Sequence, residues 1–194
     1  LITFDKSFKE FVKDLSFKDI WENNFLNFNN RILLSYSWPL RSFPNYAQQL
    51  EMESLGKPAN PKSIFKKTSQ TIFGGFGPKA QHSYFQQLHQ GTENYSVDFF
   101  SNSEDRVDEK LISKQLQAQL TLFKNCPREL KGSQEEVKAN VNFNHFELAK
   151  IDPFHLGYLI ALWEYRTFIT AKILQINPFD QFGVEAGKKL TEKL

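Results

Sequence analysis

The chain has 194 residues, of which 40% are hydrophobic and 15% aromatic, and this composition predicts a folded protein with a substantial core. Its 24 basic and 22 acidic side chains leave a net charge of +2, which is too balanced to indicate nucleic acid as a partner. Cys126 is the only cysteine, so an internal disulfide is excluded, and a reducing compartment, the cytoplasm, is expected. The longest apolar stretch, 154–174, is interrupted by ionisable side chains and predicts a buried helix instead of a membrane span.

Helical and strand patterns alternate along the chain, which predicts an α/β fold. The expected elements, in chain order, are a helix over 4–15, a strand over 31–38, a helix over 43–56, a strand over 71–73, a helix from about 81 to 91, a strand over 94–100, a helix over 109–123, a strand over 139–148 and helices over 152–175 and 179–194. In open α/β sheets ligands collect where parallel strands end, so we expect functional residues after the apolar runs.

The segment 76–92 follows a group of glycines and carries two of the four histidines. Its helical spacing is closed by Gly91, so Gln81 and His82 are expected near a helix N-terminus. Unpaired N–H groups at such an end suit an anionic or oxygen-rich ligand beside an imidazole. His89 lies two turns later on the same face, where the alternative to a functional role is a hydrogen-bonded packing residue.

Two carboxylates, Glu51 and Glu53, lie near the end of the helix predicted over 43–56. The negative end of the helix dipole tends to raise the proton affinity of a carboxylate, which suits a general base. The alternative is a pair of solvated surface charges. The loop that follows, 58–67, is rich in lysine and is expected to be exposed.

The last predicted helix places three polar side chains, Gln181, Glu185 and Lys188, at spacing i, i+4 and i+7. Ideal helical geometry would bring all three to one face. An amide, a carboxylate and an ammonium group in a row can bind a phosphorylated polyhydroxyl ligand. The alternative is a solvated stripe of charges.

Three separated segments resemble the glucose-6-phosphate isomerase family: Leu-Glu-Met-Glu-Ser-Leu-Gly-Lys at 50–57, Gln-His-Ser-Tyr-Phe-Gln-Gln-Leu-His-Gln-Gly-Thr at 81–92 and Phe-Asp-Gln-Phe-Gly-Val-Glu-Ala-Gly-Lys at 179–188. Residues 153–165 resemble the long helix before the family's C-terminal signature. The resemblance runs from about residue 38 to 194 and covers the C-terminal third of the family's sequence. The chain lacks an initiator methionine and is expected to be a piece of a longer protein.

The resemblance implies a three-layer α/β/α sugar-isomerase domain with a mostly parallel sheet and C-terminal helices. This domain is expected to span 1–194, with a helical segment over 152–194 packed on it. The activity that it implies is the interconversion of glucose 6-phosphate and fructose 6-phosphate, through ring opening and a cis-enediol intermediate. Neither a metal nor an organic cofactor is implied.

The resemblance also implies roles for individual residues. Glu53 matches the base that moves a proton between C2 and C1 of the sugar. His82 matches the group that opens the ring, which in this family is contributed across the interface of a homodimer. Lys188 matches an ammonium group near the ring oxygen, and Gln181 matches a substrate-binding amide.

Two departures leave other functions open. The usual Trp-Gly-Glu-Pro-Gly-Thr-Asn appears here as Phe-Gly-Gly-Phe-Gly-Pro-Lys at 73–79, and the family's phosphate-binding loop and its arginine have no counterpart. The chain alone is therefore expected to be nearly inactive. A non-catalytic module for sugar-phosphate binding or dimerisation is one alternative. A metal-dependent hydrolase that uses His82, His89 and Glu53 is another, although no metal-binding motif supports it.

Overall fold

The computed structural model describes residues 6–104 and 110–194. The starts of the helices predicted at 4 and at 109 lie outside these residues. The elements are α1 (Lys6–Phe25), β1 (Asn30–Ser35), α2 (Phe43–Leu55), β2 (Thr71–Phe76), α3 (Gly77–Ala80), α4 (Phe85–Gln90), β3 (Tyr95–Asn102), α5 (Lys110–Lys124), the 3₁₀ turn η2 (Arg128–Leu130), β4 (Val141–Leu148), α6 (Pro153–Leu174) and α7 (Phe182–Thr191).

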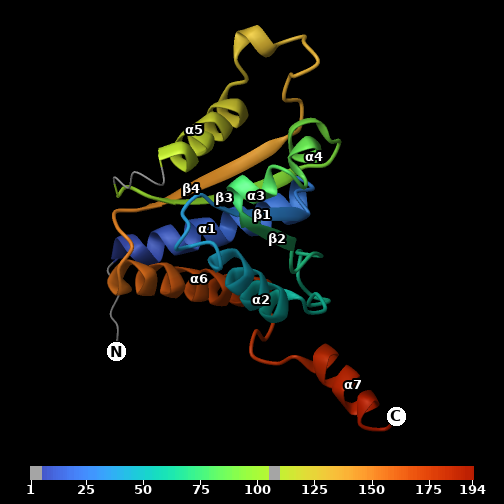
Figure 1. Cartoon of the computed structure of the whole chain (residues 1–194). Helices are drawn as coiled ribbons and strands as arrows, with labels where there is room; N and C mark the ends of the chain where they lie inside the picture. Colours follow the sequence, from blue (N-terminus) through green and yellow to red (C-terminus); the bar gives the residue numbers. More distant parts are fainter. Residues whose placement is uncertain (1–5, 105–109) are drawn as a thin grey trace.

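The four strands form one sheet in the order β2-β1-β3-β4, and every pairing in it is parallel. Helices cover both faces, which confirms the three-layer α/β/α prediction (Figure 1). α1, α2 and α6 lie on one face, and α3, α4 and α5 lie on the other (Figure 1). Parallel sheets require this arrangement because their strands are buried on both sides. In the described ranges, no helix is long and apolar enough to cross a membrane.

Alternate residues of β1 supply the two cores. Leu33 points into the core shared with α1, α2 and α6, whereas Ile32 and Leu34 point into the core under α3, α4 and α5. Trp163 of α6 and Phe100 of β3 anchor the first core with rings 5.2 Å apart and no exposed surface. A sheet covered in this way leaves its strand ends and helix ends as the places where polar groups can meet a ligand.

Two elements differ from their predicted bounds. α1 continues through the asparagine cluster to Phe25, well beyond residue 15, and its second half also buries side chains such as Ile20. β2 runs through Gly74 and Gly75 instead of ending there. A Cβ at Gly74 would overlap the backbone carbonyl of Leu33, so this glycine allows close approach of the two strands.

A cluster of five buried charged side chains lies between the sheet and its helices. Arg166 donates from Nε and Nη2 to the two carboxylate oxygens of Asp19, both at 2.7 Å, and from Nη1 to Asp98 at 3.0 Å. Arg31 pairs with Asp19 at 2.8 Å and also with Glu51. Burial alone would raise the pKa of Asp19, but the neighbouring Arg166 and Arg31 guanidinium groups outweigh it and hold this pKa well below its usual range.

Candidate functional site

Glu53 lies in the last turn of α2, and its side chain is exposed. Gln49, one turn earlier, lies with its amide nitrogen 3.5 Å from Glu53 Oε1. The negative end of the helix dipole lies at the same turn. Glu53 is therefore a solvent-accessible carboxylate carried by a packed helix, which is a rigid support for a group that must meet a ligand.

Glu51 is buried, and the prediction that it is a solvated surface charge is wrong. It accepts a hydrogen bond from Trp163 Nε1 at 2.7 Å and pairs with Arg31. Two residues of separation on a helix place the side chains of Glu51 and Glu53 about 200° apart, so one faces the core and the other faces solvent. The only sequence signal for the pairing of Glu51 with Arg31 is that Arg31 is a single charged residue at the start of the apolar run 31–38.

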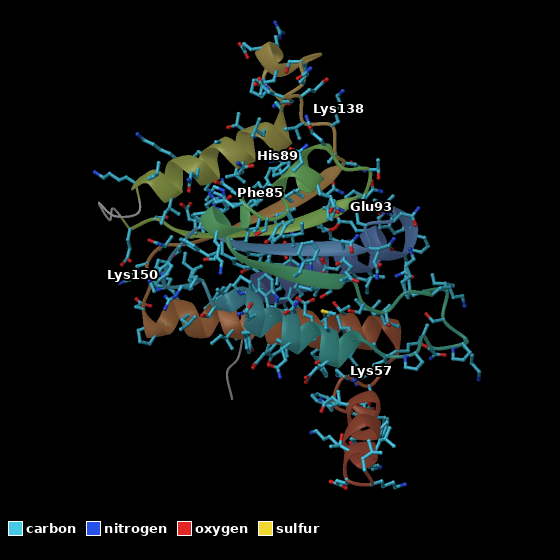
Figure 2. All side chains as sticks on the ribbon, turned by 45° about the vertical axis from the view of Figure 1, so that its right-hand side comes forward. Lys57, Phe85, His89, Glu93, Lys138 and Lys150 are labelled. Carbon is cyan, nitrogen blue, oxygen red and sulfur yellow. The ribbon has the colours of Figure 1, made fainter. Side chains whose placement is uncertain are left out.

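Lys57 joins the end of α2 to the segment before α7. Its Nζ donates to the backbone oxygen of Glu53 at 2.5 Å and to the backbone oxygen of Asp180. The Asp180 carboxylate lies 3.7 Å from the same ammonium group. Figure 2 shows Lys57 between the end of α2 and α7. These contacts bring Glu53 close in space to the chain that leads to Gln181.

α7 begins at Phe182, three residues later than predicted. Gln181 is its N-cap, with φ −140° and ψ 50°, so Gln181 does not share the helical face with Lys188 that the sequence predicted. Asn177 and Asp180 form hydrogen bonds in the preceding turn and delay the helix start. Glu185 and Lys188 are both helical and exposed.

An open hollow of about 410 Å³ lies beside these residues, between α2, α6 and the chain before α7. Its lining includes Leu50 and Ser54 of α2, Phe168 of α6, and Phe179. The rings of Phe168 and Phe179 have their centroids 6.2 Å apart. The hollow is large enough for a small molecule, and Glu53 immediately precedes one of its lining residues.

His82 lies in the turn between α3 and α4, three residues before the first residue of α4, and so near a helix N-terminus but outside the helix. The backbone N–H groups of Gln81 and His82 donate to Gly77 and Lys79 at 3.1 and 3.2 Å. They are therefore not free to bind an anion. The His82 side chain is exposed.

The structure brings Glu53, Gln181 and α7 to one side of the chain and places His82 elsewhere. α2 covers one face of the sheet, whereas α3 and α4 cover the other (Figure 1). A hydrogen bond of 2.7 Å from Thr68 to the backbone oxygen of Lys57 also holds the end of α2 near the beginning of β2, whereas His82 follows the end of that strand. Within one chain, the imidazole and the Glu53 carboxylate lie across the sheet from one another.

His89 is a packing residue. Its Nε2 lies 2.8 Å from the side-chain oxygen of Gln119, and the Phe85 and Phe123 rings contact the imidazole edge to face. Figure 2 shows His89 and Phe85 of α4 on the side of the sheet that α5 also covers, and Gln119 belongs to α5. In the described residues, no three His, Cys, Asp or Glu side chains are grouped as metal ligands would be.

We expect the protein to lose stability between pH 7.5 and pH 5. Burial lowers the pKa of His89 below 6.5, and partial desolvation lowers that of His145, whose side chain is more exposed, in the same direction. As the pH falls through 6.5, the unfolded chain binds protons that the folded chain does not, so the free energy of unfolding decreases.

Urea unfolding of wild type and of a His89→Gln/His145→Gln variant tests this. The variant should show a flatter pH dependence, and His82→Gln should retain the wild-type one. Equal slopes in the double variant and wild type would contradict the prediction.

Comparison with known proteins places this chain in a family. The family model described as phosphoglucose isomerase matches residues 9–194. The glucose-6-phosphate isomerase of Legionella pneumophila (strain Lens) is 38% identical over 171 residues, which are 87% of this chain and 34% of the relative. That of Acinetobacter baumannii is 35% identical over 199 aligned residues, covering 90% of this chain and 36% of the relative. The chain thus spans about a third of the length of these curated relatives.

Solved structures agree with the sequence comparison. A crystal structure of a glucose-6-phosphate isomerase from Chlamydia trachomatis superposes with a TM-score of 0.80 at 31% identity, covering 92% of this chain and 37% of that one. A hypothetical protein from Thermus thermophilus superposes with a TM-score of 0.68 at 19% identity, and this second match shows the fold alone. The matching model and the relatives together show that the chain belongs to the phosphoglucose isomerase family.

Proposed function

We propose that this chain is the C-terminal part of an enzyme that interconverts glucose 6-phosphate and fructose 6-phosphate. The observation that carries the proposal is a family match over 9–194 whose three motif segments contain Glu53, His82 and Lys188. The chain covers about a third of its relatives and has no counterpart of the family's phosphate loop. Remote phosphate binding supplies energy for orienting the reacting carbons, so the chain alone is expected to have little activity.

Glu53 is the proposed general base. The reaction removes the proton at C2 of the open-chain sugar and returns a proton at C1, through a cis-enediol. An exposed carboxylate on the rigid end of α2 is suited to both transfers because it can reach a bound sugar without moving the helix. Lys188 on α7 is proposed to lie near the ring oxygen, and Gln181 is proposed to bind the substrate through its amide.

His82 is proposed to serve the site of a second copy in a homodimer. Ring opening requires a proton to move between the ring oxygen and a hydroxyl group, and an imidazole can perform this transfer near neutral pH. The supporting observation is geometric: Glu53 belongs to α2 on one face of the sheet, whereas His82 lies between α3 and α4, which cover the other face, and both side chains are exposed. Two chains related by a twofold axis could bring each imidazole to the other chain's carboxylate.

Subunit mixing tests this proposal in the natural protein that carries this chain. Glu53→Gln and His82→Ala homodimers should each have low activity on the closed-ring substrate. After the two are dissociated and mixed, about half of the dimers should be hybrids with one intact site, which restores roughly a quarter of wild-type activity. No gain over the separate variants would contradict a shared site.

A non-catalytic sugar-phosphate module remains the second candidate. The observation that favours it is the Phe-Gly-Gly-Phe-Gly-Pro-Lys segment at 73–79, which replaces the acid of the usual motif and adds an exposed lysine. Absence of isomerase activity in the natural wild-type protein, combined with saturable binding of glucose 6-phosphate, would favour this candidate.

A further inference from the structure

Lys57 closes the end of α2 in a way that involves its side chain directly. The chain turns at Gly56, whose N–H donates to Met52 at 3.0 Å, and the Lys57 side chain folds back over the last helical turn. There its ammonium group binds the Glu53 carbonyl, which has no partner within the helix. The cation also complements the negative end of the helix dipole.

The same ammonium group binds Asp180 twice, through the backbone oxygen and, at 3.7 Å, through the carboxylate. An ammonium group has three donors, and the two backbone oxygens take two of them, while the Asp180 carboxylate forms an ion pair with the same group. The Lys57 side chain is only 12% exposed and that of Asp180 is 25% exposed, so water screens the contacts less than at an open surface. We call this set of contacts, from Lys57 to Glu53 and to Asp180, the Lys57 bridge.

The Lys57 bridge matters because α7 has little packing of its own. Each residue from Phe182 to Thr191 is exposed, and α7 buries no side chain against the rest of the chain. Its placement therefore depends on the preceding residues, where Phe179 contacts Phe168 and Asp180 joins Lys57. Figure 1 shows α7 extending away from the three layers.

We infer that Lys57 is a positioning residue for the isomerase reaction. Its bridge fixes the spacing between the helix end that carries Glu53 and the segment that carries Gln181 and Lys188. Lys57 acts through backbone atoms of the two supports and not through contact with the reacting carbons. This inference rests on the proposed function for its catalytic consequence, although the bridge itself does not.

Lys57→Met in the natural protein tests the inference by two independent measurements. Hydrogen exchange of peptides covering residues 177–191 should become several-fold faster, while exchange in β1 and β3 stays unchanged. Misplacement of the two halves of the site should lower kcat by about 10- to 100-fold with a much smaller change in KM, because the geometry of proton transfer is affected more than binding. Asp180→Asn, which removes the charge of the carboxylate but keeps a side-chain oxygen that can accept from Asn177, should change both measurements in the same direction and by less.

Lys62→Met is the matched control, since Lys62 is an exposed lysine in the same loop. It should alter neither measurement. Unchanged exchange in Lys57→Met would overturn the bridge. Faster exchange with wild-type kcat would overturn the positioning role. If the wild-type protein has no isomerase activity, the proposed function fails, but exchange still reports on the bridge.

Discussion

Replacing Glu53 with glutamine in the natural protein that carries this chain is expected to lower kcat by about 10²- to 10⁴-fold, the usual contribution of a general base. The amide has nearly the same shape as the carboxylate but cannot accept the C2 proton. Because the Glu53 side chain is exposed, the free energy of unfolding should change by less than about 0.5 kcal/mol. Steady-state kinetics with glucose 6-phosphate and urea unfolding measure the two quantities.

Exchange of the C2 hydrogen with deuterated solvent distinguishes the base from the ring-opening group. Glu53→Gln should abolish this exchange even with open-chain substrate, whereas His82→Ala should retain it. Glu164→Gln makes the same chemical change at an exposed carboxylate beside the same hollow and should leave kcat near the wild-type value. A Glu53→Gln variant that keeps more than about a tenth of wild-type kcat would remove Glu53 from the role of base.

Replacing Arg166 with methionine should lower the free energy of unfolding by about 3–5 kcal/mol. Methionine fills much of the volume but leaves the buried Asp19 and Asp98 carboxylates with Arg31 as their remaining guanidinium partner, at 2.8 and 4.0 Å. The Arg166 guanidinium also stacks on Trp163 with its carbon 4.7 Å from the ring centroid, and this contact is lost as well. Urea unfolding at pH 7 measures the difference.

Acid should reduce the difference between Arg166→Met and wild type. In wild type the pKa of Asp19 is depressed, so this carboxylate contributes stability above pH 3.8 that is lost as the pH falls further. The variant lacks much of that contribution, so the two unfolding free energies should approach one another as the pH falls below about 4. Lys172→Met, at an exposed position of the same helix, should cost less than about 1 kcal/mol. Similar losses for both substitutions would argue against the buried cluster as a source of stability.

The three-layer architecture could be predicted from the sequence because helix and strand patterns depend on residues that are close together in the chain. The alternation of strand and helix patterns predicted all four strands of the sheet, and the Asp152-Pro153 pair predicted the start of α6, where Asp152 accepts from the His155 N–H at 2.9 Å. Exposure was harder to predict. Phe11 and Leu111 follow helical spacing but are 45% and 68% exposed, because spacing alone does not tell how wide a face the neighbouring elements cover.

Motifs in the sequence predicted the candidate site residues, but they did not predict which side chains surround those residues. The Glu51 contacts join residues 20 and 112 positions apart, and the Lys57 contact with Asp180 spans 123 positions. Pairings at such separations depend on the packing of helices on the sheet, and charge patterns along one segment cannot reveal them. Lys57 lies at the end of the Met-Glu-Ser-Leu-Gly-Lys motif, but its neighbours along the chain carry no signal for a contact with Asp180.

The hydrogen bonds between Asp19 and Arg166 join positions 147 residues apart. The ribosome therefore synthesises Asp19 long before Arg166. β1, β2 and β3, with the helices between them, are synthesised while Asp19 still lacks its bidentate partner. The Asp19 carboxylate can be buried with Arg166 only after α6 has left the ribosome. The contact closes a long loop of the chain, and such a contact cannot form before both of its ends have been synthesised. If translation is stopped before Arg166, α1 should therefore stay accessible to proteases and chaperones. Once Arg166 and α6 have left the ribosome, α1 should become protected.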